Sequence, residues 1–479
     1  MDRISVDVLA FDRVKAGTFF TVAAFLILAT YFSPHIWQHG EAREALVIRD
    51  IVDHHRWVLP LRNNDLPSKP ILYHWMGAAF SELMGLSDFT IRLPSVVAAA
   101  FLAWMTYALG TFAETRKTGL LAVGILASMF EFWDSGTEAR VDMLFAALIG
   151  AAVASWYVWY RSGRESARAA TYLSAALAVL TKGPAGFVIP ALIIVCFVVL
   201  AGDLRSLFKF FSWPWLLIAV GIDVGWYLAA YQRGGAAFWH KQIVYENVDR
   251  FLGEGKFQTR QSFFSQAFWL ATRLFPWSVA LVLPLVRWMG GQRQDLFGRF
   301  LHTWWLGIFV FFVFAAGHRA IYLLPIYPAV ALLAARECVA FLDSGRKIFG
   351  NPRTPTSRWV TSVVVLMAID AALATAIPIS RTVREDGNDQ EEFVEDLVPK
   401  IPPTAAVYAA LGFPETARIV LAHRLKRDIP FRALMKCDEE YYYLTRGQTG
   451  ASCAPNNPTT VSATRNGTLQ LLHVSAASR

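Results

Sequence analysis

Long runs of apolar residues, separated by short polar segments, fill most of this 479-residue chain. A helix needs about 20 mainly apolar residues to cross a bilayer, so each run predicts a membrane-spanning helix. We expect about eleven spans between residues 1 and 380. They lie near residues 17–33, 92–111, 118–133, 143–160, 168–182, 184–201, 212–231, 266–286, 300–316, 320–335 and 359–379. The pattern predicts an all-α polytopic membrane protein.

Two longer polar segments, residues 34–91 and 232–265, interrupt this pattern and predict loops. Within the first, apolar residues recur at helical spacing from Ala45 to Val52. This helix is too short to span a membrane, so we expect it to be amphipathic and to lie at the interface.

Residues 381–479 are more polar and predict a small α/β domain after the transmembrane domain at 1–380. Helices are expected at 389–399 and 414–425, and strands at 405–411 and 440–444. Asn466-Gly467 lies between two β-prone runs, which is typical of a hairpin turn.

The composition supports a membrane protein. Hydrophobic residues make up 55% of the chain and charged residues 17%, against about 25% charged residues in soluble domains. The chain also has 35 Phe and 17 Trp, which suit a lipid-facing surface and its interfaces. These values exclude an ordinary soluble enzyme, a disordered protein and a secreted disulfide scaffold.

The net charge of +8 has a topological explanation. Lys and Arg gather in alternate loops, which share one side of the membrane if the N-terminus is cytoplasmic. These residues are Arg116, Lys117, Arg161, Arg164, Arg168, Arg205, Lys209, Arg287, Arg293, Arg299, Arg336, Arg346, Lys347, Arg353 and Arg358. The positive-inside rule then places both long loops and the tail outside the cytoplasm, and we expect no nucleic-acid partner.

The first long loop contains the sharpest candidate for chemistry. Glu41 stands at the start of the expected helix, where the helix dipole favours an ionised carboxylate. Such a carboxylate can accept a proton from an incoming hydroxyl or amine, which makes Glu41 a candidate general base. The alternative is a helix-terminal charge without chemistry.

Basic side chains recur in the outward loops. Lys69 and Arg92 fall at headgroup level, where they either hold a lipid phosphate or only extend to the interface. Asp142 stands at the edge of a span with Arg140 as its nearest candidate partner, and Lys182 lies between two spans. We count Asp142 with Glu41 among the catalytic residues, holding a cation or the acceptor in place; a helix cap is the alternative.

Cations that converge near a carboxylate would suit a phosphate leaving group and a general base. The candidate ligands of such a phosphate are Lys69, Arg140, Lys182, Arg250, His318, Arg319 and Tyr322, and the resemblance described below implies that it is the phosphate of a sugar donor.

No GxxxxGK[ST], GxGxxG or HExxH motif occurs, so nucleotide, dinucleotide and zincin chemistry have no support. Cysteine spacing gives no zinc site, no cofactor is expected, and a divalent metal is left open without a supporting ligand pattern. Cys437 and Cys453 are the two thiols of the tail, and we expect a disulfide between them in an oxidising compartment.

Together these segments resemble the lipid-linked-sugar glycosyltransferases of the type-C membrane fold. The closest likeness is to the aminoarabinose transferases of lipid A, and the protein O-mannosyltransferases are more distant. The matching pieces, in order, are Gly40-Glu41-Ala42-Arg43, Trp57-Val58-Leu59-Pro60, Lys69-Pro70, Arg92-Leu93-Pro94-Ser95, Arg140-Val141-Asp142-Met143, Lys182-Gly183-Pro184, Glu246-Asn247 with Arg250-Phe251, and His318-Arg319 with Tyr322-Leu323-Leu324-Pro325.

The resemblance implies a polyprenyl-phosphate sugar donor and an inverting transfer at the periplasmic face of a bacterial inner membrane. The acceptor would be a glycolipid, a polysaccharide or a protein. The family often has Asp-Glu where this chain has Gly40-Glu41, so the base role falls on Glu41. Ser68 stands where the lipid A enzymes usually have a glutamate before their Lys-Pro. This difference argues against a metal bound by that glutamate and against aminoarabinose as the sugar.

Two other function classes fit parts of this pattern. A transporter or flippase of a lipid-linked sugar would use the same cations without an essential base, but it should show repeat symmetry and acids within its spans. A non-catalytic assembly subunit would use the tail as a docking module.

Overall fold

A computed structural model describes residues 39–253, 264–278, 295–315, 319–343, 389–410, 413–431, 440–446, 459–464 and 469–474, with a few positions between 22 and 36 and Leu281. The chain forms two compact units. We call the first, Met1–Phe32 with Ser68–Tyr73 and Arg92–Ala376, the helical unit. We call the second, Ser33–Pro67 with His74–Ile91 and Ile377–Arg479, the mixed unit. The sequence-based division near residue 380 stays a prediction.

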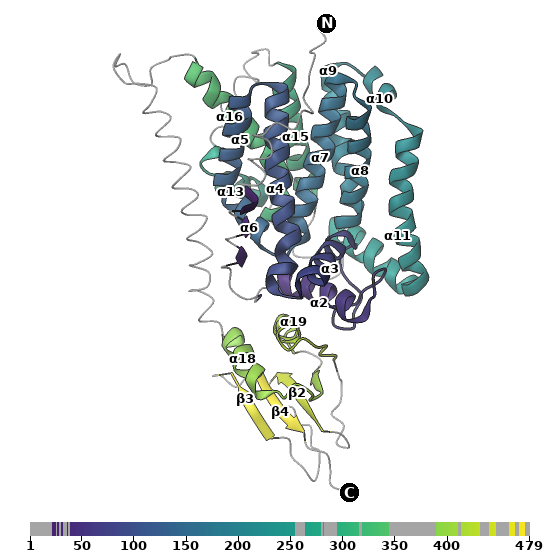
Figure 1. Cartoon of the computed structure of the whole chain (residues 1–479), viewed down its shortest axis with the longest axis vertical. Coiled ribbons are helices and arrows are strands. Elements are labelled where there is room, and N and C mark those ends of the chain that lie inside the picture. The colour runs from purple at the N-terminus through teal and green to yellow at the C-terminus, as the bar shows by residue number, and fades with distance from the viewer. Residues whose placement is uncertain are drawn as a thin grey trace, which may run out of the picture. The chain divides into compact units, whose positions relative to one another are not determined.

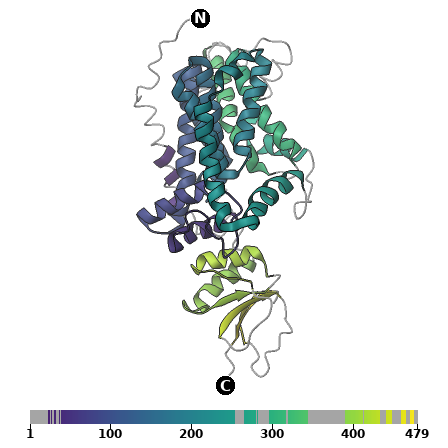
Figure 2. The same cartoon turned by 90° about the vertical axis from the view of Figure 1, so that its right-hand side faces the viewer.

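The helical unit is built from long helices that run side by side (Figures 1 and 2). In chain order the elements are α4 (Asp88–Ala113, whose first turn belongs to the mixed unit), α5 (Arg116–Ser128), α6 (Phe130–Thr137), α7 (Val141–Ser162), α8 (Glu165–Lys182), α9 (Ala185–Ala201), α10 (Arg205–Phe210), α11 (Trp213–Trp239), η1 (His240–Asp249), α12 (Arg250–Leu252), α13 (Phe264–Arg273), α15 (Leu296–Phe314), η3 (Ala320–Ile326) and α16 (Tyr327–Asp343). Helix α7 packs against α8 and α9, and α5 packs against α16.

An aromatic cluster fills the contact between α7, α9 and α15. The indole ring of Trp156 lies 5.5 Å from the ring of Phe197 and 6.3 Å from that of Phe300, and all three side chains are buried. Large rings bury much apolar area at low entropic cost, so this cluster fixes how the three helices pack.

Five helical segments among the described residues are long and apolar enough to cross a membrane. They are Asp88–Ala113, Val141–Ser162, Trp213–Asp249, Leu296–Phe314 and Ala320–Ala340, and the shorter Ala185–Ala201 is also apolar. The protein is therefore a mainly helical, multi-span membrane protein. The predicted span at 359–379 lies outside the described residues, and so do most positions of the span at 17–33.

The segment predicted as an outward loop at 232–265 is helical over the part that the structure describes, and its placement outside the membrane stays a prediction. Helix continues from α11 through η1 and α12 to Leu252, with an interruption at Gly235. Phe238, Gln242 and Glu246 are spaced four residues apart and are all buried. One face of this helix is therefore buried, and its polar residues Gln242 and Glu246 belong to a buried contact surface.

The expected span at 118–133 is also divided. The backbone of Met129 is extended (φ −74°, ψ 124°), and it separates α5 from α6. The indole of Trp277 donates a hydrogen bond of 2.8 Å to the Ser128 hydroxyl at this break.

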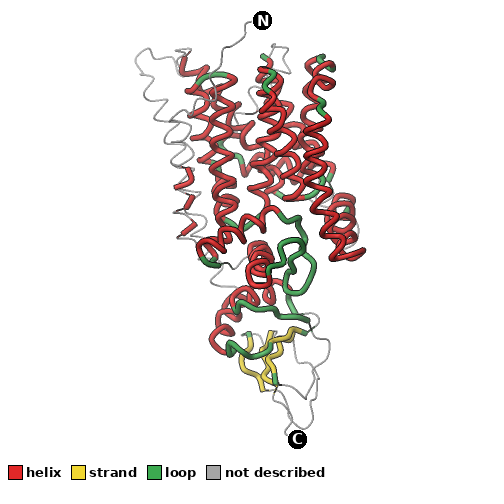
Figure 3. The backbone as a smooth tube through the Cα atoms, turned by 45° about the vertical axis from the view of Figure 1, so that its right-hand side comes forward, coloured by secondary structure: helices red, strands yellow, loops and turns green. Residues whose placement is uncertain are grey.

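The mixed unit contains α2 (His39–His54), most of α3 (Leu72–Met84), α18 (Asp389–Leu397), η4 (Val398–Lys400) and α19 (Glu415–Arg424). Its strands are β1 (Val407–Ala409), β2 (Tyr441–Arg446), β3 (Thr459–Ala463) and β4 (Leu469–Val474). They form one sheet in the order β1-β2-β4-β3, in which β1 and β2 are parallel and the other pairs antiparallel. Among the described residues, the strands of Figure 3 belong to this unit. The helices and strands predicted for the tail are confirmed.

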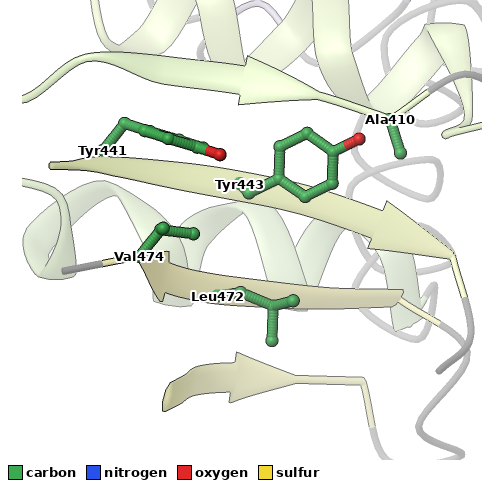
Figure 4. Packing of buried hydrophobic residues seen from close by; sticks show 5 residues of the cluster. All are labelled: Ala410, Tyr441, Tyr443, Leu472 and Val474. Carbon is green, nitrogen blue, oxygen red and sulfur yellow. The ribbon is translucent and has the colours of Figure 1, made fainter. Parts of the chain in front are cut away.

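The sheet core follows the alternation of its strands. Tyr441 pairs with Val474 and Tyr443 with Leu472 across β2 and β4, and with Ala410 they form a buried cluster (Figure 4). Strands β3 and β4 pair antiparallel around Asn466-Gly467, as a hairpin requires. That turn and both Cys437 and Cys453 lie outside the described residues.

Helix α2 has the predicted extent but a different environment. Every residue from Glu44 to Ile51 is buried, including Arg49 and Asp50. Ile48 packs so closely on α3 that a Cβ at Gly77 would lie 2.4 Å from the Ile48 Cδ1. Protein therefore covers the apolar face that was assigned to lipid, and the position of α2 at the membrane interface stays a prediction.

Candidate active site

The ion pair between Asp142 and Lys182 lies in the helical unit. Asp142 is the second residue of α7, and Lys182 is the last residue of α8. The Lys182 Nζ donates to the Asp142 Oδ1 at 2.5 Å. It also lies 4.6 Å from the ring centre of Tyr322 and 5.1 Å from that of Phe145. Asp142 thus binds a cation, and the helix cap position belongs to Arg140.

A second buried ion pair joins Lys69 to η1. The Lys69 Nζ lies 3.4 Å from the Glu246 Oε2, and the Lys241 Nζ approaches the other oxygen of the same carboxylate at 3.9 Å. The Gln242 side chain donates to the Lys69 backbone carbonyl at 3.2 Å. Both the side chain and the backbone of Lys69 are therefore held by η1.

Arg140 is a third cation near Asp142. Its guanidinium lies 3.0 Å from the Glu138 carboxylate, and its carbonyl accepts a hydrogen bond from Ser95 at 3.3 Å. Arg140 and Lys69 both interact electrostatically with Asp142, in addition to Lys182. We call Lys69, Arg140, Lys182 and Lys241 the cation cluster; three of its four members were predicted as phosphate ligands.

The backbone between α8 and α9 brings Lys182 close to η1. Gly183 adopts φ +91°, a conformation that side-chain-bearing residues rarely adopt. A Cβ here would lie 2.8 Å from the Asn247 Oδ1, and Asn247 itself donates to the Gln242 carbonyl at 2.5 Å. Gly183 thus allows the Lys182 loop to pack directly on η1.

The structure describes the other predicted phosphate ligands to different extents. Tyr322 contacts Lys182 through its ring. Arg319 is exposed and comes directly before η3. His318 lies outside the described residues, and for Arg250 only the backbone position at the start of α12 is described.

Glu41 lies in the mixed unit, in the first turn of α2, with only 3% of its surface exposed. Nearby on the same helix, Glu44 accepts from Arg43 at 2.6 Å and pairs with His74 Nε2 at 2.7 Å. Burial tends to raise the pKa of Glu44, but the charge of Arg43 and the hydrogen bond to His74 outweigh it and hold this pKa well below its usual range. Helix α2 therefore carries an ionised, fully partnered carboxylate one turn after Glu41.

Sequence reasoning did not assign roles to Glu44, Gln242 or Glu246. The four-residue spacing of Phe238, Gln242 and Glu246 was a usable signal, because it predicts a helix with one partly polar inward face. The pairing of Glu44 with His74 had no local signal, since these residues lie 30 positions apart.

The chemistry of this arrangement suits an anion. Several lysine and arginine side chains from separate segments can stabilise a phosphate that develops charge as it leaves. Within the described part of the chain, no three His, Cys, Asp or Glu side chains gather as metal ligands would.

The chain is similar to known proteins in sequence and in fold. The family described as dolichyl-phosphate-mannose-protein mannosyltransferase matches residues 68–225. Two curated relatives are the undecaprenyl phosphate-alpha-4-amino-4-deoxy-L-arabinose arabinosyl transferases of Shewanella sediminis, 27% identical over 70% of the chain, and of Sodalis glossinidius, 28% identical over 75%. The match spans 62% and 66% of the length of these relatives.

The crystal structure of ArnT from Cupriavidus metallidurans bound to undecaprenyl phosphate superposes with a TM-score of 0.74 at 14% identity. The superposition covers 97% of this chain and 99% of that one.

Proposed function

We propose that this protein is an inverting glycosyltransferase. Its sequence resembles the arabinosyl transferases and the mannosyltransferase family, and its fold resembles that of ArnT. It moves a sugar from a polyprenyl-phosphate donor to a lipid or glycan acceptor at the periplasmic face of the inner membrane. The observation that carries this proposal is the cation cluster, in which Lys69, Arg140 and Lys182 come from separate segments and all interact electrostatically with Asp142.

The cation cluster would bind the donor phosphate. When the bond between sugar and phosphate breaks, the phosphate gains charge, and Lys69, Arg140 and Lys182 would stabilise that charge. Asp142 and Glu246 hold the two lysines in place through their ion pairs. Arg250, His318, Arg319 and Tyr322 remain proposed further ligands of the same phosphate.

Glu41 would act as the general base. A carboxylate near the reacting carbon can take the proton of the acceptor as the new glycosidic bond forms, and the phosphate leaves from the opposite face. Inversion at the sugar carbon follows from this single displacement. No metal enters this account.

We also propose about eleven spans, a cytoplasmic N-terminus and a periplasmic tail after residue 380, on the distribution of Lys and Arg among the loops. The donor class with most support is an undecaprenyl-phosphate-linked sugar, because the curated relatives act on one. Their aminoarabinose donor is the first to test.

The test uses purified full-length protein in lipid nanodiscs with synthetic undecaprenyl-phosphate aminoarabinose and lipid A. We expect release of undecaprenyl phosphate and a matching mass increase of the acceptor, both lost in Lys69→Ala and retained in Lys209→Ala, which changes an exposed lysine on α10. Donor binding without release would contradict an enzyme and favour the flippase. Mass spectrometry of envelope glycolipids from a deletion strain then identifies the natural acceptor.

A further inference from the structure

A two-residue turn in the first long loop contacts the C-terminal part of the mixed unit, Ile377–Arg479, which we call the C-terminal domain. Arg62 and Asp65 exchange backbone hydrogen bonds of 2.7 and 2.9 Å, and Asn63 and Asn64 between them have φ values of +50° and +68°. Asparagine tolerates this left-handed backbone better than most residues, and paired positive φ values are typical of a tight hairpin turn. The turn is therefore a defined structure that directs the Asn63 side chain.

Asn63 binds both backbone groups of one residue of the C-terminal domain. Its Oδ1 accepts from the Ile429 N–H at 2.6 Å, and its Nδ2 donates to the Ile429 carbonyl at 3.1 Å. Arg418 of α19 donates to the same carbonyl at 2.9 Å and pairs with Asp65 at 3.4 Å. Asn63 and Ile429 are both buried, so these bonds are shielded from water.

Helix α2 has its own attachment to the same domain. The Arg49 guanidinium is 6% exposed; it donates to the Ala422 carbonyl at 2.8 Å and to Asp428 at 3.2 Å. A buried guanidinium without partners would be strongly destabilising, so α2 depends on these groups to remain in place. On the next residue, Asp50 accepts from the Leu61 N–H at 2.8 Å and so ties α2 to the segment that leads into the turn.

We propose that the C-terminal domain is a positioning element for the first long loop, with Asn63 and Arg49 as its positioning residues. The proposal rests on the proposed function, because α2 carries the candidate base Glu41. The turn follows α2 in the same long loop and is tied to it by Asp50 and Leu61, so the attachment restrains both segments. The domain acts on transfer by holding these segments in one conformation and does not contact the reacting atoms.

The test compares Asn63→Asp with Asn64→Asp in the full-length protein. Both replace an amide by a carboxylate in the same left-handed turn, but Asn64 is exposed. Asn63→Asp removes the donor to Ile429. We expect kcat to fall roughly 10- to 100-fold, as small misplacements of catalytic groups do, with the KM for the donor unchanged and with faster amide hydrogen exchange in residues 39–54. Asn64→Asp should match the wild type in all three measurements.

Arg49→Lys provides a second variant. It keeps the positive charge but cannot bind Ala422 and Asp428 together as the guanidinium does. We expect the same loss of kcat and of α2 protection. If either variant folds and α2 exchanges as in the wild type, or if kcat is unchanged, the proposal is overturned.

The unmodified protein offers a test that needs no variant. In increasing denaturant, amides of residues 39–54 and 415–431 should begin to exchange together, through one shared opening. Separate openings of α2 and α19 would contradict the attachment. This exchange result does not depend on transfer, so failure of the proposed enzyme activity and failure of the positioning role can be told apart.

Discussion

Lysine–carboxylate pairing is the main feature of the cation cluster at the scale of single residues. Lys182 faces Asp142, Lys69 faces Glu246, and Arg140 faces Glu138. An arriving phosphate must share each cation with its carboxylate. The carboxylates therefore hold the cations ready in a fixed geometry, which lowers the cost of ordering them when the donor binds.

Lys182→Ala should weaken use of the donor much more than use of the acceptor, because it removes a positive charge that the departing phosphate needs. The loss should be roughly 10²- to 10³-fold in kcat/KM for the donor, by analogy with single stabilising donors in other active sites. Steady-state kinetics with each substrate varied in turn measures this. An unchanged donor KM and kcat with a raised acceptor KM would refute the phosphate role; Lys209→Ala is the matched control.

Glu41→Gln should abolish transfer while leaving folding and donor binding intact. The amide keeps the shape of the side chain but cannot accept the proton, so we expect a rate loss of about 10²- to 10⁴-fold. Single-turnover assays and donor-binding measurements on the purified variant check both parts. Glu82→Gln, on the exposed side of α3, is the control. Near-normal turnover of Glu41→Gln would remove this residue from the mechanism.

At the scale of elements, the loop between α8 and α9 controls how Lys182 meets η1. Gly183→Ala should place a methyl group 2.8 Å from Asn247 and also strain the backbone at φ +91°. Gly163→Ala is a matched control, since its φ is +68° and nothing lies within 4 Å of the added methyl. We expect both to lower thermal stability, but only Gly183→Ala to lose donor binding. Equal donor affinity in the two variants would show that this contact is unimportant.

Helix α2 should make the protein sensitive to acid. The pKa of Glu44 is depressed in the folded protein, so its ionised form stabilises the fold fully above the ordinary carboxyl pKa of about 4.3 and progressively less as the pH falls below it. Thermal unfolding between about pH 5 and pH 2 should show this loss in the wild type, and a weaker pH dependence in Glu44→Gln. Glu440→Gln, which changes an exposed glutamate, should keep the wild-type slope. Parallel slopes for all three proteins would contradict the assignment.

At the scale of the whole molecule, the predicted topology puts the tail in an oxidising compartment. Cys437 and Cys453 enclose a loop for which a disulfide would add about 3 kcal/mol in the chain-entropy model. We expect a membrane-impermeant maleimide to label neither thiol in intact spheroplasts until a reductant is added. Labelling without reduction would refute the disulfide. A tail that stays unlabelled even after reduction would overturn the periplasmic placement, and with it that of Glu41.

The sequence alone determined the multi-span character, the secondary structure of the tail, the extent of α2 and most of the cation cluster. Each rests on local information: apolar run length, helical periodicity, turn residues, or a motif in a fixed order. Arg140 and Lys182 could be named because a charged residue at the end of an apolar run is conspicuous wherever the chain folds, and Lys69 because its Lys-Pro motif stands in the expected order.

Only the tertiary structure decided which charges pair and what covers each helix. Asp142 and Lys182 are 40 positions apart, and Asn63 and Ile429 are 366 apart, so no local pattern relates them. The sequence of α2 has the same apolar pattern whether lipid or α3 covers that face. The polar residues of η1 likewise do not indicate in sequence that they contact Lys69. Burial depends on what packs against a segment, and that is settled only when distant parts of the chain come together.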